Sequence, residues 1–461
     1  MATFGLPSSD IIWRMSPNRR DFLITTAAAF SASRILGAND RVQVGFIGYG
    51  LIGAQHVHDF RSLPDVDLVA ISDVYEPRLR EGRAACGPRC QGYTDFRRLL
   101  EHPDIQAVVI STPDHWHALL AVMACAAGKD VYVEKPLTLF VREGRWMIAA
   151  AKRYERVVQV GTQQRSGRHY VDAVKMLQDG YIGKIHTVRM GSFRNVMPGF
   201  GTPSDADPPP ELNYDLWLGP APKRQYNPNR SLYHFRWFWD YSGGQMTNLG
   251  AHEIDVIHWA MKTRAPLAVA SAGGRFALTD NGETPDTQDS LFEYPGFTAL
   301  WSHREASRGR GQGEGLEFFG TKGSMTLSRS GFQIFPDPKI PPQNQIPEFQ
   351  GHPAGGPQRV PAGQIMPWCE PVKRSAYNDL LASHARNFID CVKSRQQPVS
   401  SLEEEHQVAA ACHLANISLR LGRKVRWDAD RDEIIGDAEA SAMLVRPYRN
   451  PWDQTLAGLQ L

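Results

Sequence analysis

The sequence predicts an α/β protein in which a doubly wound parallel sheet is followed by an α+β domain with a largely antiparallel open sheet. From residue 41 to about residue 164, short apolar runs alternate with stretches whose apolar residues recur at helical spacing. Strands separated by single helices are typical of a doubly wound parallel sheet. After about Gly180, strand-like runs are joined by Gly, Pro and Asp turns, which indicates antiparallel pairing.

The same patterns predict the division of the chain. The first domain is expected over residues 39–164, the second over residues 165–445, and a C-terminal tail over residues 446–461. Two late helical patterns, Tyr377–Ser394 and Leu402–Leu421, are expected to pack on the second sheet or to return to the first domain.

A glycine motif marks the first strand-to-helix turn. An apolar run leads into Gly48-x-Gly50-x-x-Gly53, with Ile52 inside the motif. In this arrangement the first glycine permits the tight turn, the second admits backbone amides to a pyrophosphate, and the third lets the helix pack on the strand. The pyrophosphate would lie at the helix N-terminus, where free N–H groups favour an anion. The segment is therefore predicted to bind a dinucleotide.

Asp73 indicates which dinucleotide is bound. It follows Gly53 by twenty residues, at the end of a second apolar run. In this position a carboxylate accepts hydrogen bonds from the adenosine ribose diol. Its charge would repel the additional phosphate of NADP, so NAD is predicted in preference to NADP.

The composition excludes several classes of partner. The 461 residues carry 51 Lys and Arg against 49 Asp and Glu, a formal charge of +2, with no basic stripe of the kind that nucleic acids require. The six cysteines form no CxxC pair or metal-like cluster, so no metal site is predicted. Cys86 and Cys90 could form a disulfide after export, or could be two small loop or helix residues. After the N-terminal region, no apolar run is long enough to span a bilayer.

Residues 1–38 resemble a twin-arginine export signal. Arg19 and Arg20 stand in the sequence SPNRRDFL, which is followed by a short apolar run and then by small residues up to Ala38. The alternative is a disordered amphipathic tail. We expect the twin-arginine export machinery as a partner, a periplasmic location, and a mature chain that begins near Asn39; Met15 could be the true start.

A lysine lies close to the predicted position of the nicotinamide. Glu134-Lys135-Pro136 closes an apolar run, which places it at the carboxyl edge of the sheet, where ligands bind. The ammonium donors could bind a substrate hydroxyl during its oxidation, and Glu134 could orient the lysine. The alternative is an ordinary strand end at the surface.

A histidine provides the candidate base. If a helix spans Asn248–Trp259, then Asn248, His252 and Asp255 share one face. A neutral imidazole can accept a hydroxyl proton while hydride leaves the same carbon, because its ordinary pKa lies near the working pH. The alternative is a core histidine. Arg165, just past the last parallel strand, could reach substrate or cofactor, or could be a solvated loop residue.

Together these motifs resemble those of the Gfo/Idh/MocA oxidoreductases. The resemblance rests on the glycine motif and on the sequences TPDHWH at 112–117, GKDVYVEKP at 128–136 and NLGAH at 248–252. It implies that Lys135 is the catalytic lysine and that His252 is the acid/base. Many members carry aspartate at the position of Asn248, so a hydrogen bond from Asn248 to a substrate hydroxyl is expected instead of a charged partner for His252. The resemblance further implies that three residues line the nicotinamide side of an NAD(P)-binding Rossmann domain: Thr112, Pro113 and His117.

The resemblance also predicts an activity. It implies an NAD(P)-dependent oxidoreductase acting on the CH–OH group of a sugar or polyol, and the sequences GTQQR at 161–165 and DLWLGP at 215–220 are similar to those of a secreted branch. Outside the cytoplasmic membrane there is no dependable pool of soluble NAD. We therefore expect a tightly bound cofactor that is regenerated in place.

Three functions satisfy these expectations. A dehydrogenase would pass hydride to a second carbonyl compound or other acceptor. An NAD-dependent glycosidase would form a transient keto-sugar and return the hydride, with no net redox change. A non-catalytic sugar-binding protein is the third possibility, and retention of Lys135 and His252 argues against it. The resemblance also implies a homo-oligomer formed through the open face of the second sheet.

Overall fold

The computed structural model describes residues 41–309, 315–341 and 360–459. The predicted export signal at residues 1–38 lies outside the described residues. Among those described, no helix has the length and apolar character needed to cross a bilayer. The account below concerns the compact unit of residues 42–461.

The first domain is the predicted doubly wound sheet. Its six strands are all parallel and lie in the order β3-β2-β1-β4-β5-β6. They span β1 (Val42–Ile47), β2 (Val66–Ser72), β3 (Gln91–Tyr93), β4 (Ala107–Ile110), β5 (Asp130–Val133) and β6 (Val158–Val160). The helices of this domain are α2 (Leu51–Arg61), α3 (Glu76–Cys86), α4 (Phe96–Leu100), α5 (Asp114–Ala126) and α6 (Val141–Arg153). The strand order reverses between β1 and β4, which is where sheets of this kind bind dinucleotides.

Helices cover both faces of this sheet. In β4, Val108 and Ile110 pack in the apolar cluster that includes residues of α5 and α6, whereas Val109 packs on the opposite face. The late helix α10 (Leu380–Ser394) completes that second face, since the ring of Phe388 lies 6.2 Å from that of Phe60 in α2. The C-terminal part of the chain thus returns to the first domain, which was one of the two arrangements expected from the sequence.

The second domain is built on a mixed sheet of ten described strands, in the order β14-β13-β12-β11-β7-β10-β9-β8-β15-β16. Among the described pairs, β7 and β10 are parallel and the others antiparallel, so the prediction of a largely antiparallel sheet is confirmed. The strands are β7 (Ile185–Phe193), β8 (Ala268–Gly274), β9 (Thr287–Tyr294), β10 (Phe297–Arg304), β11 (Gly315–Gly320), β12 (Gly323–Ser328), β13 (Gly331–Pro336), β14 (Val372–Ser375), β15 (Val425–Asp428) and β16 (Glu433–Ile434).

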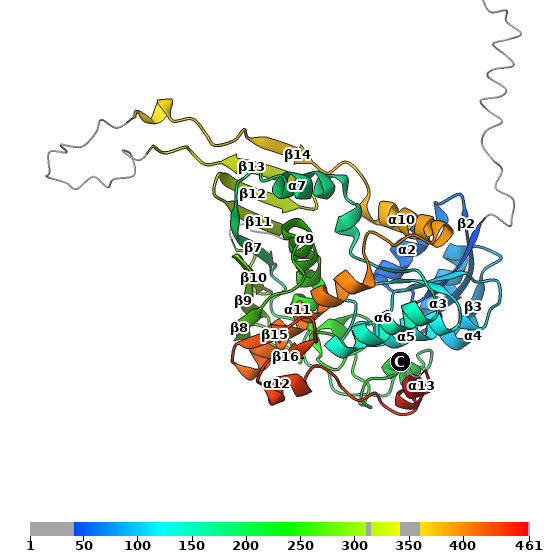
Figure 1. Cartoon of the computed structure of the whole chain (residues 1–461). Helices are drawn as coiled ribbons and strands as arrows, with labels where there is room; N and C mark the ends of the chain where they lie inside the picture. Colours follow the sequence, from blue (N-terminus) through cyan, green and yellow to red (C-terminus); the bar gives the residue numbers. More distant parts are fainter. Residues whose placement is uncertain (1–40, 310–314, 342–359, 460–461) are drawn as a thin grey trace, which may run out of the picture. The chain divides into compact units, whose positions relative to one another are not determined.

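Three helices cover the face of this sheet that is turned toward the first domain: α7 (Arg168–Gln178), α9 (Ala251–Met261) and α11 (Leu402–Leu421) (Figure 1). The predicted bounds of α11 are those observed, because Ser401 caps its N-terminus and Gly422 ends it with a positive φ of 63°. The start of α10 lies three residues later than predicted, since the side chain of Asp379 caps the helix at Leu380.

The predicted helix Asn248–Trp259 does not begin as expected. The chain forms a π-helical turn over Met246–Gly250 before α9 starts at Ala251. A π-turn holds more residues than an α-turn, so an argument from regular α-helical spacing does not place Asn248 on the face of His252.

A small separate core joins the two domains. We call residues 211–241 the strap; it contains α8 (Tyr214–Leu218) and the short helix η3 (His234–Trp237). Its apolar residues, among them Trp217 and Phe235, form a cluster against Val74 and Tyr75, which follow β2. Backbone bonds from Asn213 N to Val74 O (2.9 Å) and from Glu76 N to Glu211 O (3.0 Å) fix the strap to the first domain.

Helix α12 (Ala438–Ala442) precedes the predicted tail of residues 446–461, and that tail contains α13 (Trp452–Gly458). The ring of Trp452 lies 4.9 Å from that of Trp116 in α5. The end of the described chain therefore packs on the first domain.

The turn from β1 to α2 yields a stability prediction. We expect Gly48→Ala to lower the free energy of unfolding by about 2–4 kcal/mol. At φ +95° a Cβ on Gly48 would lie 2.7 Å from the carbonyl oxygen of Ser111. Gly50→Ala is the matched control, since Gly50 has a φ of −82° and the nearest atom to its added Cβ would be 3.9 Å away. Urea unfolding followed by tryptophan fluorescence measures both, and equal losses would contradict the prediction.

Candidate functional site

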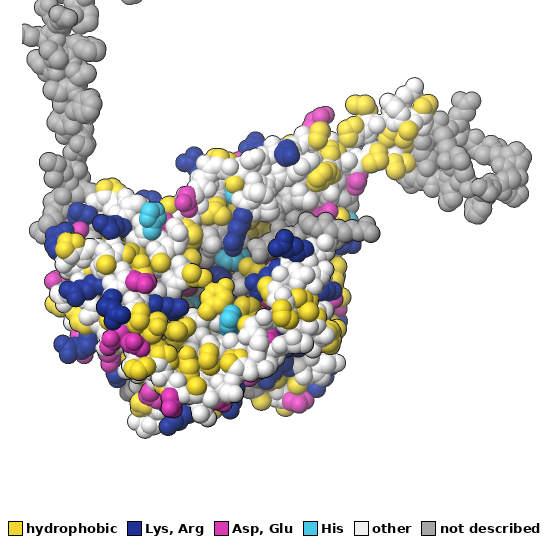
Figure 2. Space-filling model, turned by 180° about the vertical axis from the view of Figure 1, so that it is seen from behind, with side chains coloured by type: hydrophobic (Ala, Val, Ile, Leu, Met, Phe, Trp, Pro, Cys, Tyr) yellow, Lys and Arg dark blue, Asp and Glu magenta, His cyan; other side chains and the backbone are white. Residues whose placement is uncertain are grey.

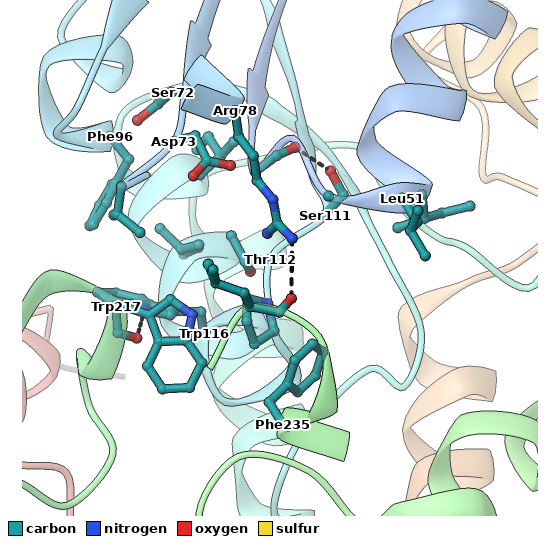
Figure 3. Close-up of a pocket in the computed structure, with 18 of the residues that line it drawn as sticks. Leu51, Ser72, Asp73, Arg78, Phe96, Ser111, Thr112, Trp116, Trp217 and Phe235 are labelled. Carbon is teal, nitrogen blue, oxygen red and sulfur yellow. Dashed lines mark hydrogen bonds between the residues drawn. The ribbon is translucent and has the colours of Figure 1, made fainter. Parts of the chain in front are cut away.

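A crevice lies beyond the carboxyl ends of β1, β2 and β4. It is the place that the strand order designates for a dinucleotide. Six of the residues predicted from the sequence line it: Gly48, Gly50, Ile52, Asp73, Thr112 and Pro113. Figure 3 shows Asp73, Ser111 and Thr112 around this space, with Trp217 and Phe235 of the strap on the opposite side. We call this space the cofactor crevice.

The glycine turn fits a pyrophosphate. A Cβ on Gly50 would stand in open space, with no atom nearer than the Arg78 guanidinium at 3.9 Å, so a ligand can approach the backbone there. Helix α2 begins after Gly50 without a side-chain cap, which leaves its first N–H groups to a bound anion. Gly53 has the predicted packing role, because a Cβ on it would lie 2.4 Å from the carbonyl oxygen of Gly48.

Asp73 is held rigidly at the end of β2. Its Oδ2 accepts from Tyr49 N at 2.7 Å and its Oδ1 accepts from Tyr75 N at 2.9 Å. Burial raises the pKa of Asp73, since the residue is 8% exposed, and the two backbone N–H groups act in the opposite direction. A carboxylate oxygen can accept more than one hydrogen bond, so Asp73 can still bind a ribose hydroxyl.

The strap forms the second wall of the crevice. Six residues of the strap line it opposite the first domain: Leu216, Trp217, Leu232, Tyr233, Phe235 and Arg236. Arg78 donates from its guanidinium to the carbonyl oxygen of Leu232 at 3.4 Å (Figure 3), and Leu232 adopts a positive φ of 60°. The crevice is therefore enclosed by both parts of the chain.

Lys135 connects the two domains at the far end of the crevice. Its Nζ donates to both the carbonyl oxygen and the Oδ1 of Asn248, each at 2.9 Å. Burial lowers the pKa of Lys135 to about 8, against the influence of the neighbouring Glu134 carboxylate. Glu134 in turn binds His56 Nε2 through Oε1 at 2.7 Å and accepts from Lys135 N. Glu134 therefore holds the backbone of Lys135 in place.

His252 lies in the first turn of α9, directly after the π-turn that carries Asn248. It is 2% exposed, and its Nδ1 has no hydrogen-bond partner among the described residues. Burial, followed by the positive charge of Lys135, holds the pKa of His252 well below its ordinary value. The imidazole is therefore neutral and able to accept a proton, and it lies within the electrostatic range of Lys135.

Two residues that were predicted to bind the cofactor, His117 and Glu134, lie behind the wall of the crevice. His117 Nδ1 lies 2.7 Å from the carbonyl oxygen of Pro136, and its Nε2 lies 2.9 Å from that of Thr112. This buried ring fixes the Thr112 turn and the Glu-Lys-Pro turn relative to each other. Neither His117 nor Glu134 lines the crevice, so their contribution to the cofactor site is to hold its walls.

The expectation that Arg165 and Asp255 contact substrate requires correction. Arg165 Nε donates to Asp255 Oδ1 at 2.7 Å, and the two side chains are 5% and 0% exposed. The same guanidinium binds Glu404 at 2.9 Å and lies 3.7 Å from Glu405. Because carboxylates occupy its donors, the arginine connects the short helix η2 (Gln163–Ser166) to α9 and α11 and so positions the helix of His252.

Several site residues were not found from the sequence. Arg78 stands five residues after Asp73, in the first turns of α3, and the aromatic residues of the strap approach from more than a hundred residues away. The aromatic-rich sequence YHFRWFWDY at 233–241 was the available signal. Its position against the crevice depends on tertiary packing and not on local pattern.

Comparisons with known proteins agree with this arrangement. The model of the oxidoreductase family with an NAD-binding Rossmann fold matches residues 42–162, and that of the family's C-terminal alpha/beta domain matches residues 193–271 and 372–454. The chain is similar to a myo-inositol 2-dehydrogenase of Thermotoga maritima, with 25% identity over 399 residues that cover 86% of this chain and 100% of the relative.

Two further similarities differ in extent. A glycosyl hydrolase family 109 protein of Shewanella sp. is 34% identical over 154 residues, which are 32% of this chain and 34% of that protein. The crystal structure of an aldose-aldose oxidoreductase from Caulobacter crescentus has the same fold, with a TM-score of 0.60 at 19% identity, and the match covers 84% of this chain and 99% of that one.

The match therefore extends over both domains. The chain belongs to the Gfo/Idh/MocA family of oxidoreductases.

Proposed function

We propose that the protein transfers hydride between a hydroxyl-bearing carbon of a sugar or polyol and a tightly bound NAD. The observation that carries the proposal is the hydrogen bond from Lys135 to Asn248, which brings the catalytic candidates of both domains to the end of the cofactor crevice. The names of the relatives, an inositol dehydrogenase and an aldose-aldose oxidoreductase, support a carbohydrate substrate.

Each of the three residues at the site has a separate role in the proposed reaction. His252 accepts the hydroxyl proton: its lowered pKa leaves the ring unprotonated, and no hydrogen bond among the described residues occupies its Nδ1. Protonated Lys135 donates to the same oxygen and stabilises the negative charge that develops on it. Asn248 Oδ1 orients the ammonium group. Bound NAD would accept the hydride from the carbon.

NAD is proposed in preference to NADP because of Asp73. Its carboxylate is fixed by two backbone N–H groups at the ribose end of the crevice. A 2′-phosphate there would meet the negative charge at close range. Arg78 also faces this space, but it is engaged with the carbonyl oxygen of Leu232.

Tight binding is supported by the strap. Dissociation of the cofactor would require the Arg78–Leu232 bond to open, and the strap is also held by the backbone bonds at Val74 and Glu76. Retention suits an enzyme exported through the twin-arginine pathway to the periplasm, which we propose from the signal-like sequence at residues 1–38.

The glycosidase is the second candidate function. It is favoured by the similarity to a glycosyl hydrolase family 109 protein, and it needs the same proton and hydride transfers. A non-catalytic sugar-binding role would not need the Lys135–Asn248 contact or a neutral buried histidine. We place it last.

We also propose a homo-oligomer. On the open face of the second sheet, the half-exposed Leu300 and Phe319 lie beside Arg189, whose guanidinium is 5.2 Å from the Phe319 ring. A second copy of this sheet would cover these side chains.

The proposed roles predict that Lys135→Met and His252→Asn lower kcat by about 10²–10⁴-fold, the range that general acid–base catalysis contributes, and leave the cofactor bound. Turnover is measured with free sugars and with aryl glycosides. Cofactor reduction supports the dehydrogenase, and release of the aglycone without net reduction supports the glycosidase.

The matched controls for these variants are Lys184→Met and His186→Asn, since both residues are exposed on the second domain. They should keep full activity. Full turnover by either active-site variant would refute the assignment.

The pH dependence follows from the pKa of Lys135. Because its pKa is about 8, the charged donor is lost as the pH rises through 8, and kcat/KM should fall there. Neutral His252 gives no acid limb near pH 6. Lys135→Arg, whose guanidinium stays charged, should lower the rate but remove the alkaline decline. A rate that rises through pH 8 would show instead that neutral lysine is the base.

Retention of the cofactor is tested on the purified, dialysed protein. We expect nearly one equivalent of NAD to be released on denaturation. Arg78→Gln should lower this content several-fold, since it removes the bond to Leu232. Arg80→Gln is the control, because Arg80 is exposed on the same helix and pairs with Glu76. Wild-type protein that loses its NAD during dialysis would exclude tight binding.

A further inference from the structure

Cationic side chains gather around the catalytic pair. Besides Lys135, Arg236 of the strap and Arg329 of the β12–β13 turn lie within electrostatic range of this site. In Figure 2, lysine, arginine and histidine side chains surround the hollow at the middle of the face. The hydride transfer described above requires neither arginine.

Arg329 is presented by a rigid turn. The turn is fixed by a bond between Ser328 Oγ and Ser330 Oγ at 2.8 Å, and the carbonyl oxygen of Ser328 lies 3.1 Å from His169 Nε2. His169 is in α7, directly after the helix η2 whose Arg165 binds α9. This series of contacts places the turn on the side of the second domain that carries His252.

The Arg329 side chain itself is exposed. Among the described residues, no hydrogen bond or ion pair holds its guanidinium. An arginine whose backbone is fixed, and whose guanidinium has no hydrogen-bond or ion-pair partner among the described residues, is suited to bind an anionic ligand.

Arg236 approaches from the opposite element. It lines the cofactor crevice, and its guanidinium lies 4.8 Å from the Phe235 ring and donates to the carbonyl oxygen of Tyr233 at 3.3 Å. None of the described ion pairs includes it. Its charge and that of Arg329 both lower the pKa of Lys135.

Among the described residues, the nearby acids form no ion pair with either arginine. Glu134 is bonded to His56 beneath Lys135. Asp114 is buried, accepts from Ser242 Oγ, and has a pKa that burial raises. Asp255 is paired with Arg165. The cationic side chains that lower the pKa of His252 include Lys135 and Arg329, whereas burial lowers the pKa of His384 to about 4 and leaves it neutral.

We propose that the substrate is an anionic carbohydrate, bearing a carboxylate, sulfate or phosphate group, and that Arg329 binds this group with Arg236 on the opposite side. The inference rests on the proposed function, because it assumes that the space beside Lys135 and His252 receives the substrate. Arg329 is then a specificity residue, and it takes no part in proton or hydride transfer.

The test compares wild type with Arg329→Gln in the cofactor-loaded, full-length protein. The control is Arg426→Gln, since Arg426 is exposed on β15, at the other end of the same sheet. The probes are D-glucose, D-glucuronate, D-glucose 6-phosphate and inorganic sulfate. Binding is measured by the shift in thermal unfolding, and KM is measured for each sugar that turns over.

In wild type we expect at least one anion to bind more tightly than glucose. Arg329→Gln should weaken anion binding on the order of tenfold, the size of one charge-assisted hydrogen bond, with binding of glucose, kcat and NAD content unchanged. The sugar acid and the sugar phosphate identify which anion is preferred. Sulfate binding alone would indicate the charge site without its sugar.

Wild type that binds none of the anions, or Arg329→Gln that binds them as wild type does, would overturn the proposal. The proposed function is judged separately. If Lys135→Met turns over normally while Arg329→Gln loses anion binding, the redox assignment fails and the anion site stands.

Discussion

The bond from Lys135 to Asn248 is the interaction on which the site depends. The lysine follows β5 of the first domain, and the asparagine lies in the π-turn before α9 of the second. A buried ammonium is costly unless oxygen atoms surround it. Two oxygens of Asn248 and the nearby Glu134 carboxylate supply that environment. The need to satisfy this charge therefore sets the distance between the cofactor domain and the helix of His252.

The arginine cluster beneath the site adds a second connection. Arg165 faces Asp255 and Glu405, whose pKa values are both raised by burial. Thr162 Oγ1 and Ser400 Oγ donate to Glu405 at 2.6 and 2.9 Å. The charge of Asp255 raises the pKa of Glu405 further, while the Arg165 guanidinium lowers the pKa of both acids. The buried ion pair of Arg165 with Asp255 joins η2 to α9, and Arg165 also lies 3.7 Å from Glu405 of α11, so α9 is held at both its start and its middle.

The sequence predicted the parts of the site that depend on short-range pattern. The glycine turn, Asp73 and Lys135 stand at the ends of strands, and strand ends can be located from periodicity and turn residues. Arg165 and Asp255 are ninety residues apart, and no local signal shows that they are partners. The π-turn at Met246–Gly250 was also not predicted, because no residue type distinguishes it from the start of an α-helix.

Lys135 and His252 lie outside the lining of the cofactor crevice, and this bears on the proposed repeated use of one bound cofactor. Residues that line the crevice come from the strap and from the strand ends, and neither Lys135 nor His252 is among them. Arg236 belongs to the crevice, and its charge affects the pKa of Lys135. Under the proposed function, a substrate would bind beside Lys135, outside the part of the crevice that the strap lines. In such an arrangement, a second carbohydrate that enters the same space could receive the hydride which the first one gave up.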